Sequence, residues 1–429
     1  MQNASDNYLN KLEKIKESAL YQQLGSADTS FIDSISRSYR FTYQELRILL
    51  EAARDLEMWG LESFKALWEQ CEREVISNEN GSRKKEVLRL FRKRVSILRD
   101  ADNFYPKEGF RPPARRALKI ISEKSNRKIF GDCPVASEKT VCCNLKTIDA
   151  VQNCAFGCSY CTIQTFYGDS AVVEEDLKSK LDAIELESGR FYHIGTGQSS
   201  DSLVWGNRNG MLDDLADFAT SHPNILLELK TKSANVSWFL KNKAPANMIC
   251  SWSLNTPEII RNEEHFTASL EKRLEAAEAV VKNGGKIAFH FHPIVHYKNW
   301  KDDYLRLAES VQSRFSSDDI LFISFGSLTF IKPVIKEIRK RGGNTNILKM
   351  PMVPDPHGKL TYPDDIKVEL FKTMYGAFSA WHEKVYFYLC MERAEIWDRV
   401  FGWHYQTNSL FEKDFGRRVM EKLRQPVQA

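Results

Sequence analysis

The first 105 residues place apolar positions with the period of an α-helix. Thr42 and Glu45 make a capping-box pattern, in which each side chain can bond the backbone of the other residue at a helix start. The apolar positions that follow at helical spacing are Leu46, Leu49, Leu50, Ala53 and Leu56. Gly60 stands where such a helix would end. We therefore predict a helical N-terminal domain over residues 1–105.

Two more helices are expected in this block, one from Leu61 to Ile76 and one over Arg83–Arg99, with a polar turn at Asn78–Ser82 between them. The third helix carries an apolar stripe together with eight basic side chains: Arg83, Lys84, Lys85, Arg89, Arg92, Lys93, Arg94 and Arg99. Such a helix could lie along nucleic-acid phosphates. The alternative is a solvated face on a helix that packs through its apolar side.

After residue 105 the rhythm changes. Prolines between Tyr105 and Pro113 break the helical pattern, and we expect a linker over residues 106–129. Six short apolar runs then alternate with helix-length segments: Lys146–Val151, Phe191–Gly195, Ile225–Leu229, Met248–Leu254, Lys286–Ile294 and Ile320–Ser324. Parallel strands need right-handed crossovers, so this pattern predicts an α/β fold with a partial (β/α)6 TIM-like barrel. The predicted barrel domain covers residues 130–403, and a C-terminal tail covers 404–429.

Composition narrows the class of protein. The chain has 429 residues, 61 Lys+Arg against 57 Asp+Glu, a net charge of +4 and nine cysteines. These values are typical of globular proteins and exclude disordered and collagen-like chains. The polar N-terminus lacks the pattern of a signal peptide, and the longest apolar stretch, Ile320–Ile331, is too short for a bilayer span. We expect no membrane helix and a reducing, cytoplasmic location.

Three cysteines follow the first predicted strand in the spacing C-x3-C-x2-C: Cys154, Cys158 and Cys161. A structural zinc site usually has four protein ligands, whereas three thiolates on a 4Fe-4S cluster leave one iron open for another ligand. The alternative is a zinc site or incidental thiols, since Cys133, Cys142 and Cys143 lie upstream and could supply a fourth ligand. The remaining cysteines, Cys71, Cys250 and Cys390, are expected to be ordinary buried thiols.

The cysteine spacing resembles that of the radical S-adenosylmethionine (AdoMet) superfamily. Several other strand ends, taken in order, resemble the spore photoproduct lyase family over roughly residues 130–402. The strings that carry this resemblance are Ile194–Ser202, Glu228–Ser233, Ser251–Asn255, Arg261–Arg273, Ala288–Ile294 and Val385–Glu392. The resemblance implies a radical AdoMet barrel and a lyase-like enzyme.

The resemblance also assigns roles to individual residues. Cys154, Cys158 and Cys161 would bind the cluster. The residues that would bind AdoMet are Ser200, Lys232, Ser253 and the backbone carbonyl of His292, with Gly195 and Gly197 letting the backbone approach the ligand. A lysine beside the AdoMet carboxylate also makes physical sense as a charge-assisted hydrogen bond. Strand alternation sends Lys230 and Lys232 to the same face, and the family pattern favours Lys232. Local bonding to backbone is the alternative for Ser200 and Ser253.

In this family, a 5′-deoxyadenosyl radical takes a hydrogen atom from a methylene-bridged thymine dimer in spore DNA, and a cysteine and tyrosines return hydrogen. The resemblance thus implies DNA as a partner and a reductant protein such as flavodoxin or ferredoxin. Tyr160 would be one of the relay tyrosines. The lesion must also be extruded from the duplex to reach the site.

The sequence departs from the family pattern at three places. Gln198 stands where the family has its hydrogen-donating cysteine, and Thr162 replaces the second tyrosine. The segment 357–365, a basic hairpin in the family, contains Asp364 and Asp365, which would oppose phosphate binding. A radical enzyme acting on RNA, protein or a small molecule is therefore an alternative, and a zinc-containing nucleic-acid-binding protein is a second one.

The remaining polar residues allow two interpretations each. His290 and His292 alternate with phenylalanines, so both point to one face of a strand, as ligand-binding residues or as hydrogen-bonded interior histidines. Glu263, Glu264 and Arg273 belong to a family string, but a helix-start carboxylate and a surface ion pair would explain them almost as well. Tyr386–Tyr388 fits a buried strand better than a base-stacking platform.

Overall fold

The computed structural model describes residues 2–76 and 80–424. These residues form two compact units. The first comprises the chain up to Pro113 together with Phe330–Met352, and the second comprises Ala114–Thr329 together with the chain from Val353 onward. A segment from late in the sequence thus belongs to the N-terminal unit.

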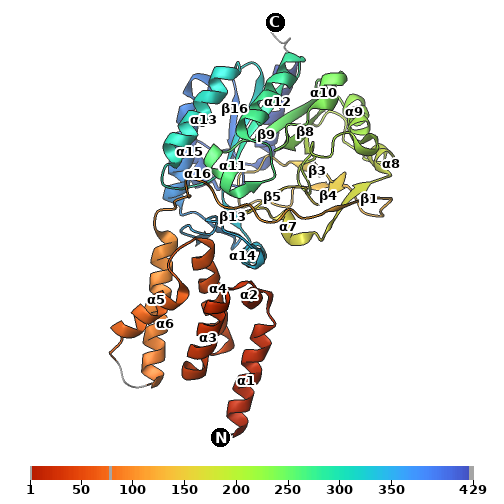
Figure 1. Cartoon of the computed structure of the whole chain (residues 1–429). Coiled ribbons are helices and arrows are strands. Elements are labelled where there is room, and N and C mark those ends of the chain that lie inside the picture. The colour runs from red at the N-terminus through yellow and green to blue at the C-terminus, as the bar shows by residue number, and fades with distance from the viewer. Residues whose placement is uncertain (1, 77–79, 425–429) are drawn as a thin grey trace. The chain divides into compact units, whose positions relative to one another are not determined.

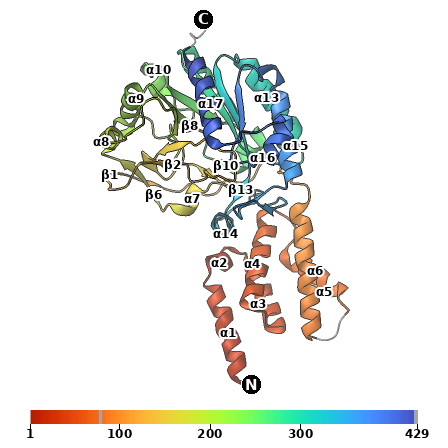
Figure 2. The same ribbon diagram turned by 180° about the vertical axis from the view of Figure 1, so that it is seen from behind.

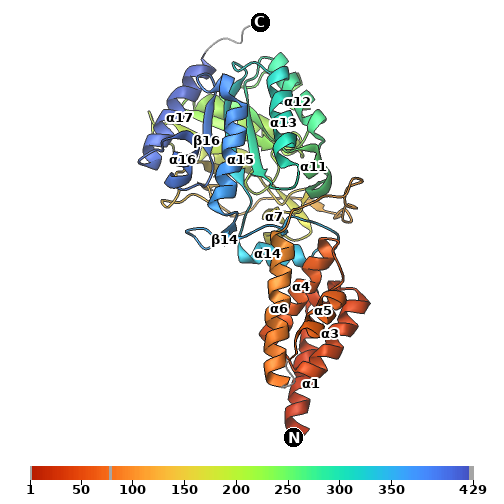
Figure 3. The same cartoon turned by 90° about the vertical axis from the view of Figure 1, so that its left-hand side faces the viewer.

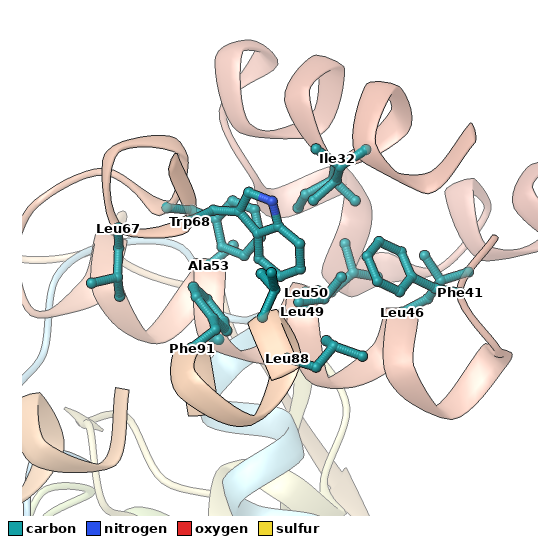
Figure 4. Close-up of a cluster of buried hydrophobic side chains, with 14 of the residues drawn as sticks. Ile32, Phe41, Leu46, Leu49, Leu50, Ala53, Leu67, Trp68, Leu88 and Phe91 are labelled. Atoms are coloured by element: carbon teal, nitrogen blue, oxygen red, sulfur yellow. The ribbon is translucent and has the colours of Figure 1, made fainter. Parts of the chain in front are cut away.

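The first unit is helical. Its helices are α1 (Gln2–Lys16), α2 (Ala19–Gln23), α3 (Ser26–Tyr39), α4 (Tyr43–Met58), α5 (Phe64–Glu74), α6 (Asn80–Asp100) and α14 (Lys332–Lys340). The Thr42 capping box is confirmed, with both reciprocal hydrogen bonds present. Apolar side chains of α3, α4, α5 and α6 pack around Trp68 and Phe91 in a closed core (Figure 4). The predicted second helix begins later than expected, at Phe64, because the Ser63 side chain caps it.

The basic helix α6 uses much of its charge within this unit. Lys84 pairs with Glu45 at 2.9 Å, Arg89 pairs with Glu86 and Arg94 pairs with Glu74. Its apolar residues Val87, Leu88 and Phe91 are buried. These contacts favour the packed-helix interpretation over a phosphate-binding one. Of the polar turn predicted at Asn78–Ser82, residues 78 and 79 lie outside the described part, and 80–82 belong to α6.

Two arginines join the segment 330–352 to α4. Arg339 donates two hydrogen bonds of 2.7 Å to the carboxylate of Asp55. Arg54, which is only 3% exposed, donates to the backbone carbonyls of Arg339, Arg341 and Gly343. Because these arginines donate in both directions, the late segment is held to the helical unit at several points.

The second unit is built on a curled sheet of eight strands, with helices on its outer side (Figure 1). In spatial order the strands are β16 (Tyr386–Leu389), β12 (Ile320–Ser327), β11 (Ile287–Ile294), β9 (Met248–Ser253), β8 (Ile225–Thr231), β7 (Tyr192–Gly195), β3 (Lys146–Ile148) and β2 (Phe130–Asp132). All neighbours are parallel except β2 and β3. The predicted half-barrel is confirmed, and β16 confirms the buried strand expected at Tyr386–Tyr388.

One predicted strand is divided. The run Lys146–Val151 contributes β3 to the main sheet, but Val151 begins β4 (Val151–Gln152), which pairs antiparallel with β6 (Ser170–Glu174). Strand β6 in turn pairs in parallel with β1 (Lys119–Glu123), inside the segment predicted as a linker. Two more short strands, β5 (Gly157–Cys158) and β10 (Glu264–His265), pair with each other next to the cysteine motif.

Helices cover the outer side of the sheet, with α13 and α15 packed side by side (Figure 3). The main helices are α8 (Leu177–Asp182), α9 (Met211–Ser221), α10 (Ser237–Lys241), α11 (Pro257–Glu263), α12 (Leu270–Lys282), α13 (Trp300–Arg314), α15 (Asp364–Ala377) and α16 (Ala394–Phe401). The short elements are α7 (Ile163–Phe166), β13 (Thr329–Phe330), β14 (Val353–Pro354), β15 (Leu360–Thr361) and the 3-10 turns Arg208–Gly210 and Ser379–Trp381.

The segment predicted as a C-terminal tail contains a packed helix, α17 (Asn408–Leu423). It lies against β7, β12 and β16 (Figure 2). The Phe415 ring is fully buried, 5.3 Å from Phe322 and 5.0 Å from His193 between ring centres. The apolar face of α17 therefore completes the barrel core.

No helix among the described residues combines the length and apolar character needed to cross a bilayer.

Gly416 tests the close packing of α17. A Cβ atom added at Gly416 would lie 2.5 Å from Cγ and Cδ1 of Phe191, so we expect Gly416→Ala to lower the free energy of unfolding by about 1–3 kcal/mol. In α15, nothing lies within 4 Å of a Cβ added at Gly376, so Gly376→Ala should be neutral or stabilising by up to about 1 kcal/mol. Urea unfolding measures both. Equal effects of the two substitutions would contradict the close packing of Gly416 against Phe191.

Candidate functional site

The cysteine motif lies on a loop that Asn153 shapes. Asn153 is fully buried and has a φ of 73°, in the left-handed region that asparagine tolerates better than most residues. Its side-chain amide donates to the carbonyls of Gly168 and Ser170 at 2.8 and 3.0 Å. Further along the loop, the Ser159 amide donates to the carbonyl of Glu263 at 2.8 Å, beside the β5–β10 pair. The loop is thus fixed at both ends of the motif.

One cavity of about 120 Å³ contains most of the residues predicted to bind the cluster and AdoMet, and we refer to it as the outer cavity. Its lining residues are Cys154, Phe156, Cys158, Tyr160, Cys161, Ile163, Gly197, Ser200, Asp201, Lys230, Thr231, Lys232 and Ser253. Gly195 and His292 are not among them. They line a second cavity, described below.

Lys232 and Ser253 form a connected pair at this site. The Lys232 ammonium donates to Ser253 Oγ at 2.7 Å, and Ser253 Oγ donates to the backbone carbonyl of His292 at 2.9 Å. The hydroxyl therefore joins the ends of β8, β9 and β11. Ser200 is held locally, because its Oγ donates to the Asn153 carbonyl and accepts from Trp205 Nε1, both at 2.7 Å. Ser200 thus makes the local bonds expected under the alternative interpretation of this residue.

The buried carboxylate of Asp201, for which the sequence predicts no role, organises the loop after β7. Its oxygens accept hydrogen bonds from the amides of Leu203, Val204 and Lys232 and from the Thr231 hydroxyl, at 2.7 to 3.0 Å. Burial nevertheless raises the pKa of Asp201. By bonding the Lys232 amide, Asp201 sets the backbone from which the Lys232 side chain reaches Ser253.

Glu264, on β10, is the centre of a second buried network. Its carboxylate accepts from Arg273 Nη2 at 2.6 Å, from Asn255 Nδ2 at 3.3 Å and from the Tyr160 hydroxyl, and Lys232 Nζ lies 3.9 Å away. Glu264 is 1% exposed and Arg273 is 0% exposed. The interpretation of this pair as a surface ion pair is therefore wrong. The three-dimensional fold buries it beside the cysteine loop.

The thiols of the motif suit a bound cation. Burial raises the pKa of Cys154 to about 12 and that of Cys158 well above its usual value, and the neighbouring motif cysteines add to the increase. Thiolates at such positions need a nearby positive charge. Within the described residues, no group of three or more His, Cys, Asp or Glu side chains is already arranged as a metal site. The three thiols fit a metal group through their donor chemistry and their shared cavity.

The second cavity, of about 260 Å³, lies inside the barrel, and we refer to it as the inner cavity. It is lined by Cys133, Val135, Val141, Cys142, Cys143, Leu145, Thr147, His193, Gly195, Gly197, Gln198, Glu228, Lys230, His290, His292 and Tyr388–Met391. The prediction that Cys390 is an ordinary buried thiol is therefore wrong. Cys71 and Cys250 are fully buried, as predicted. Gln198, at the departure from the family pattern, faces this cavity.

A chain of hydrogen bonds crosses the wall of the inner cavity. Glu228 bonds His193 Nε2 at 2.7 Å and also bonds His290. His290 Nδ1 is 2.6 Å from Ser324 Oγ, which is 3.0 Å from His292 Nε2. Although burial opposes ionisation, the two imidazoles facing Glu228 hold its pKa well below the usual value. Both predicted histidines thus point into the barrel, as expected.

The sequence contains a signal that Glu228 has interior partners. The residue interrupts the apolar run of Ile225–Leu229, and a carboxylate inside a buried parallel strand needs interior partners.

The two acidic residues by which segment 357–365 departs from the family pattern also have partners in the structure. Asp364 pairs with Arg393, and Asp365 pairs with Arg399 at 2.6 Å, so both acidic charges are offset.

Comparisons with known proteins agree with this geometry. The family model of spore photoproduct lyase matches residues 144–352. The spore photoproduct lyase of Clostridium acetobutylicum is 27% identical over 180 residues, which are 40% of this chain and 53% of that protein. The spore photoproduct lyase of Bacillus subtilis is 26% identical over 202 residues, 45% of this chain and 59% of that protein. The chain thus spans between about half and three fifths of the length of these curated relatives.

Solved structures show the same fold. A spore photoproduct lyase mutant with bound AdoMet and dinucleoside spore photoproduct has a TM-score of 0.52 and 21% identity, covering 63% of this chain and 82% of that chain. A second mutant, with dinucleoside spore photoproduct, has a TM-score of 0.53 and 20% identity over the same shares. At this level of identity the likeness establishes the half-barrel fold.

The Glu264–Arg273 pair gives a test of the site's construction. Arg273→Met would leave a buried carboxylate without its closest cation, so we expect a loss of about 3–5 kcal/mol in the free energy of unfolding. Arg261→Ala is the control, because Arg261 is partly exposed and pairs with Glu258 on the same helix, and its cost should stay below about 1 kcal/mol. Denaturant titration measures both variants. If Arg273→Met lowered the free energy of unfolding no more than the control, the Glu264–Arg273 pair would not be a buried ion pair that stabilises the site.

Proposed function

We propose that the chain is a member of the spore photoproduct lyase family, whose model matches residues 144–352, and that it is a radical AdoMet enzyme. A 4Fe-4S cluster would be held by Cys154, Cys158 and Cys161, leaving one iron for AdoMet. The observation that carries this proposal is the outer cavity, where the three thiols share one space with Lys232 and Ser253.

The residues around the outer cavity have chemically distinct tasks. When bound, the cluster and AdoMet would supply reductive cleavage of the sulfonium C–S bond. The Lys232 ammonium would bind the AdoMet carboxylate, with Ser253 and the His292 carbonyl fixing its position. At Gly197 the lack of a side chain lets the backbone lie close to the end of β8, since a Cβ there would be 3.0 Å from the Cβ and the carbonyl oxygen of Lys230. The buried setting would keep water from the reacting atoms.

Tyr160 would serve as a catalytic residue at the edge of the same cavity. Its hydroxyl donates to Glu264, and its ring lies 5.9 Å from the Lys232 ammonium. Burial raises the pKa of the phenol well above its usual value, so the group keeps its proton. A neutral phenol has the O–H bond that a hydrogen-transfer role requires.

As substrate we propose a thymine lesion in DNA, the class named for the solved relatives that hold dinucleoside spore photoproduct. The offset of Asp364 and Asp365 by arginines lessens the charge conflict with phosphate at the hairpin. Gln198, which lines the inner cavity, favours a second candidate, a radical AdoMet enzyme with an RNA, protein or small-molecule substrate, because an amide does not donate a hydrogen atom as a thiol does. The other proposed partner is a reductant such as flavodoxin or ferredoxin, in the cytoplasm.

Metal analysis tests the cluster. Protein purified without oxygen should contain about four iron and four sulfide per chain and should cleave AdoMet when reduced. Cys158→Ala should lose the cluster and reduce cleavage by at least about a hundredfold, whereas Cys250→Ala, a fully buried thiol outside both cavities, should retain both. Zinc in place of iron in the wild-type protein would instead support the zinc-containing nucleic-acid-binding alternative.

The substrate requires its own experiment. Reduced enzyme with AdoMet is incubated with duplex DNA that contains the methylene-bridged thymine dimer, and the thymines formed are measured by chromatography and mass spectrometry. Repair that depends on AdoMet and on Cys158 is the expected result. Cleavage of AdoMet without any repair would reject the DNA lesion and leave the second candidate.

A further inference from the structure

Four cysteines from three separate segments meet at the inner cavity, and we refer to them as the thiol cluster. Cys133 follows β2, Cys142 and Cys143 are adjacent in a loop, and Cys390 follows β16. As whole residues all four are partly exposed, whereas Cys71 and Cys250 are buried. None of them has a role in the proposed cofactor binding.

Cys142 is the member of the cluster whose pKa is lowered. The thiol of Cys143 hydrogen-bonds Cys142 and lowers its pKa to about 6, while the pKa of Cys143 is raised well above the usual value. Burial raises the pKa of Cys390 to about 12. A thiolate is the nucleophilic form, so an electrophile that enters the inner cavity should modify Cys142 first.

Lys230 brings a cation to the same cavity without a matching anion. Its ammonium donates to His292 Nδ1 at 3.4 Å, and among the described side chains it forms no ion pair. Lys232, two residues on, has the Glu264 carboxylate 3.9 Å away. The carboxylate of Glu228 is already bonded to His193, His290 and Ser251. Burial lowers the pKa of Lys230, and the Glu228 carboxylate opposes this effect only in part.

The inner cavity adjoins the outer one. Gly197 and Lys230 line both cavities. The missing side chain at Gly197 lets its backbone approach that of Lys230 closely. A group bound in the inner cavity would therefore lie next to the proposed AdoMet position. An anionic oxygen there would supply the partner that Lys230 lacks.

We propose that the inner cavity is a binding site for an anionic oxygen group of the substrate, a carboxylate or a phosphate, with Lys230 as its cation and the Cys142 thiol in the lining of the same cavity. Assignment of the ligand as substrate rests on the proposed radical AdoMet function. The anion site itself does not, because it depends only on Lys230, the thiol cluster and the cavity.

Two alkylating reagents of nearly equal size test the site. Iodoacetate carries a carboxylate and iodoacetamide does not, so their rates at Cys142 compare an anion with a neutral analogue. The rates are measured on the protein purified without oxygen, by mass spectrometry of the Cys142 peptide. The same chain unfolded in urea supplies the intrinsic ratio of the two rates. We expect the iodoacetate-to-iodoacetamide ratio to be about tenfold higher in the native protein.

Lysine variants identify the cation. Lys230→Met should return the ratio to that of the unfolded chain, whereas Lys230→Arg should retain much of the increase. Lys232→Met is the matched control, since it removes a neighbouring positive charge that lines only the outer cavity, and it should leave the ratio raised. Equal ratios in native and unfolded wild-type protein, or a raised ratio in folded Lys230→Met, would overturn the proposal.

Protection experiments need no variant and so hold even if Lys230→Met does not fold. Inorganic phosphate or acetate should slow labelling of wild-type Cys142 by iodoacetamide, and the more effective anion identifies the phosphate or carboxylate class. Protection by neither anion would also overturn the proposal. The readout does not require AdoMet cleavage, so failure of the radical function, seen as absent iron or absent cleavage, is detected separately.

Discussion

The buried carboxylate of Glu264 constrains the rest of the site. A charge removed from water must be surrounded by donors, and here the donors come from different parts of the chain: Arg273 on α12, Asn255 after β9 and Tyr160 on the cysteine loop. Glu264 also forms part of β10, whose partner β5 contains Cys158. One ion pair therefore ties the cysteine loop to the barrel wall and sets where the three thiols stand relative to Lys232.

The barrel interior is divided into two chemically different spaces. The outer cavity has thiols, hydroxyls and a lysine whose charge Glu264 partly balances, which suits a zwitterionic cofactor. The inner cavity has a second set of thiols, the histidine chain around Glu228 and the unbalanced Lys230. Because Gly197 stands between them, a ligand in each space would be in reach of the other. This division makes chemical sense for an enzyme that brings a reactive cofactor group to a separate substrate.

The helical unit keeps its own core and most of its charge pairs to itself. The aromatic cluster around Trp68 closes its interior, and Arg54 and Asp55 on α4 bind the returning segment 330–352. The charges of α6 that pair with Glu45, Glu74 and Glu86 are not free for phosphates. A nucleic-acid contact by this unit would have to use other side chains.

The sequence by itself determined the main helices and strands and the position of the cysteine loop. Period-2 and period-3.6 patterns identified the capped helix at Thr42 and six parallel strands, and the spacing of Cys154, Cys158 and Cys161 identified the loop, because these signals are local in the chain. Only the tertiary structure decided which distant residues meet. It buried Glu264 and Arg273, added α17 to the core, separated the environments of Lys230 and Lys232, and gathered Cys133, Cys142, Cys143 and Cys390 at one cavity. Burial and long-range contacts depend on the packing of the whole chain, which no local pattern encodes.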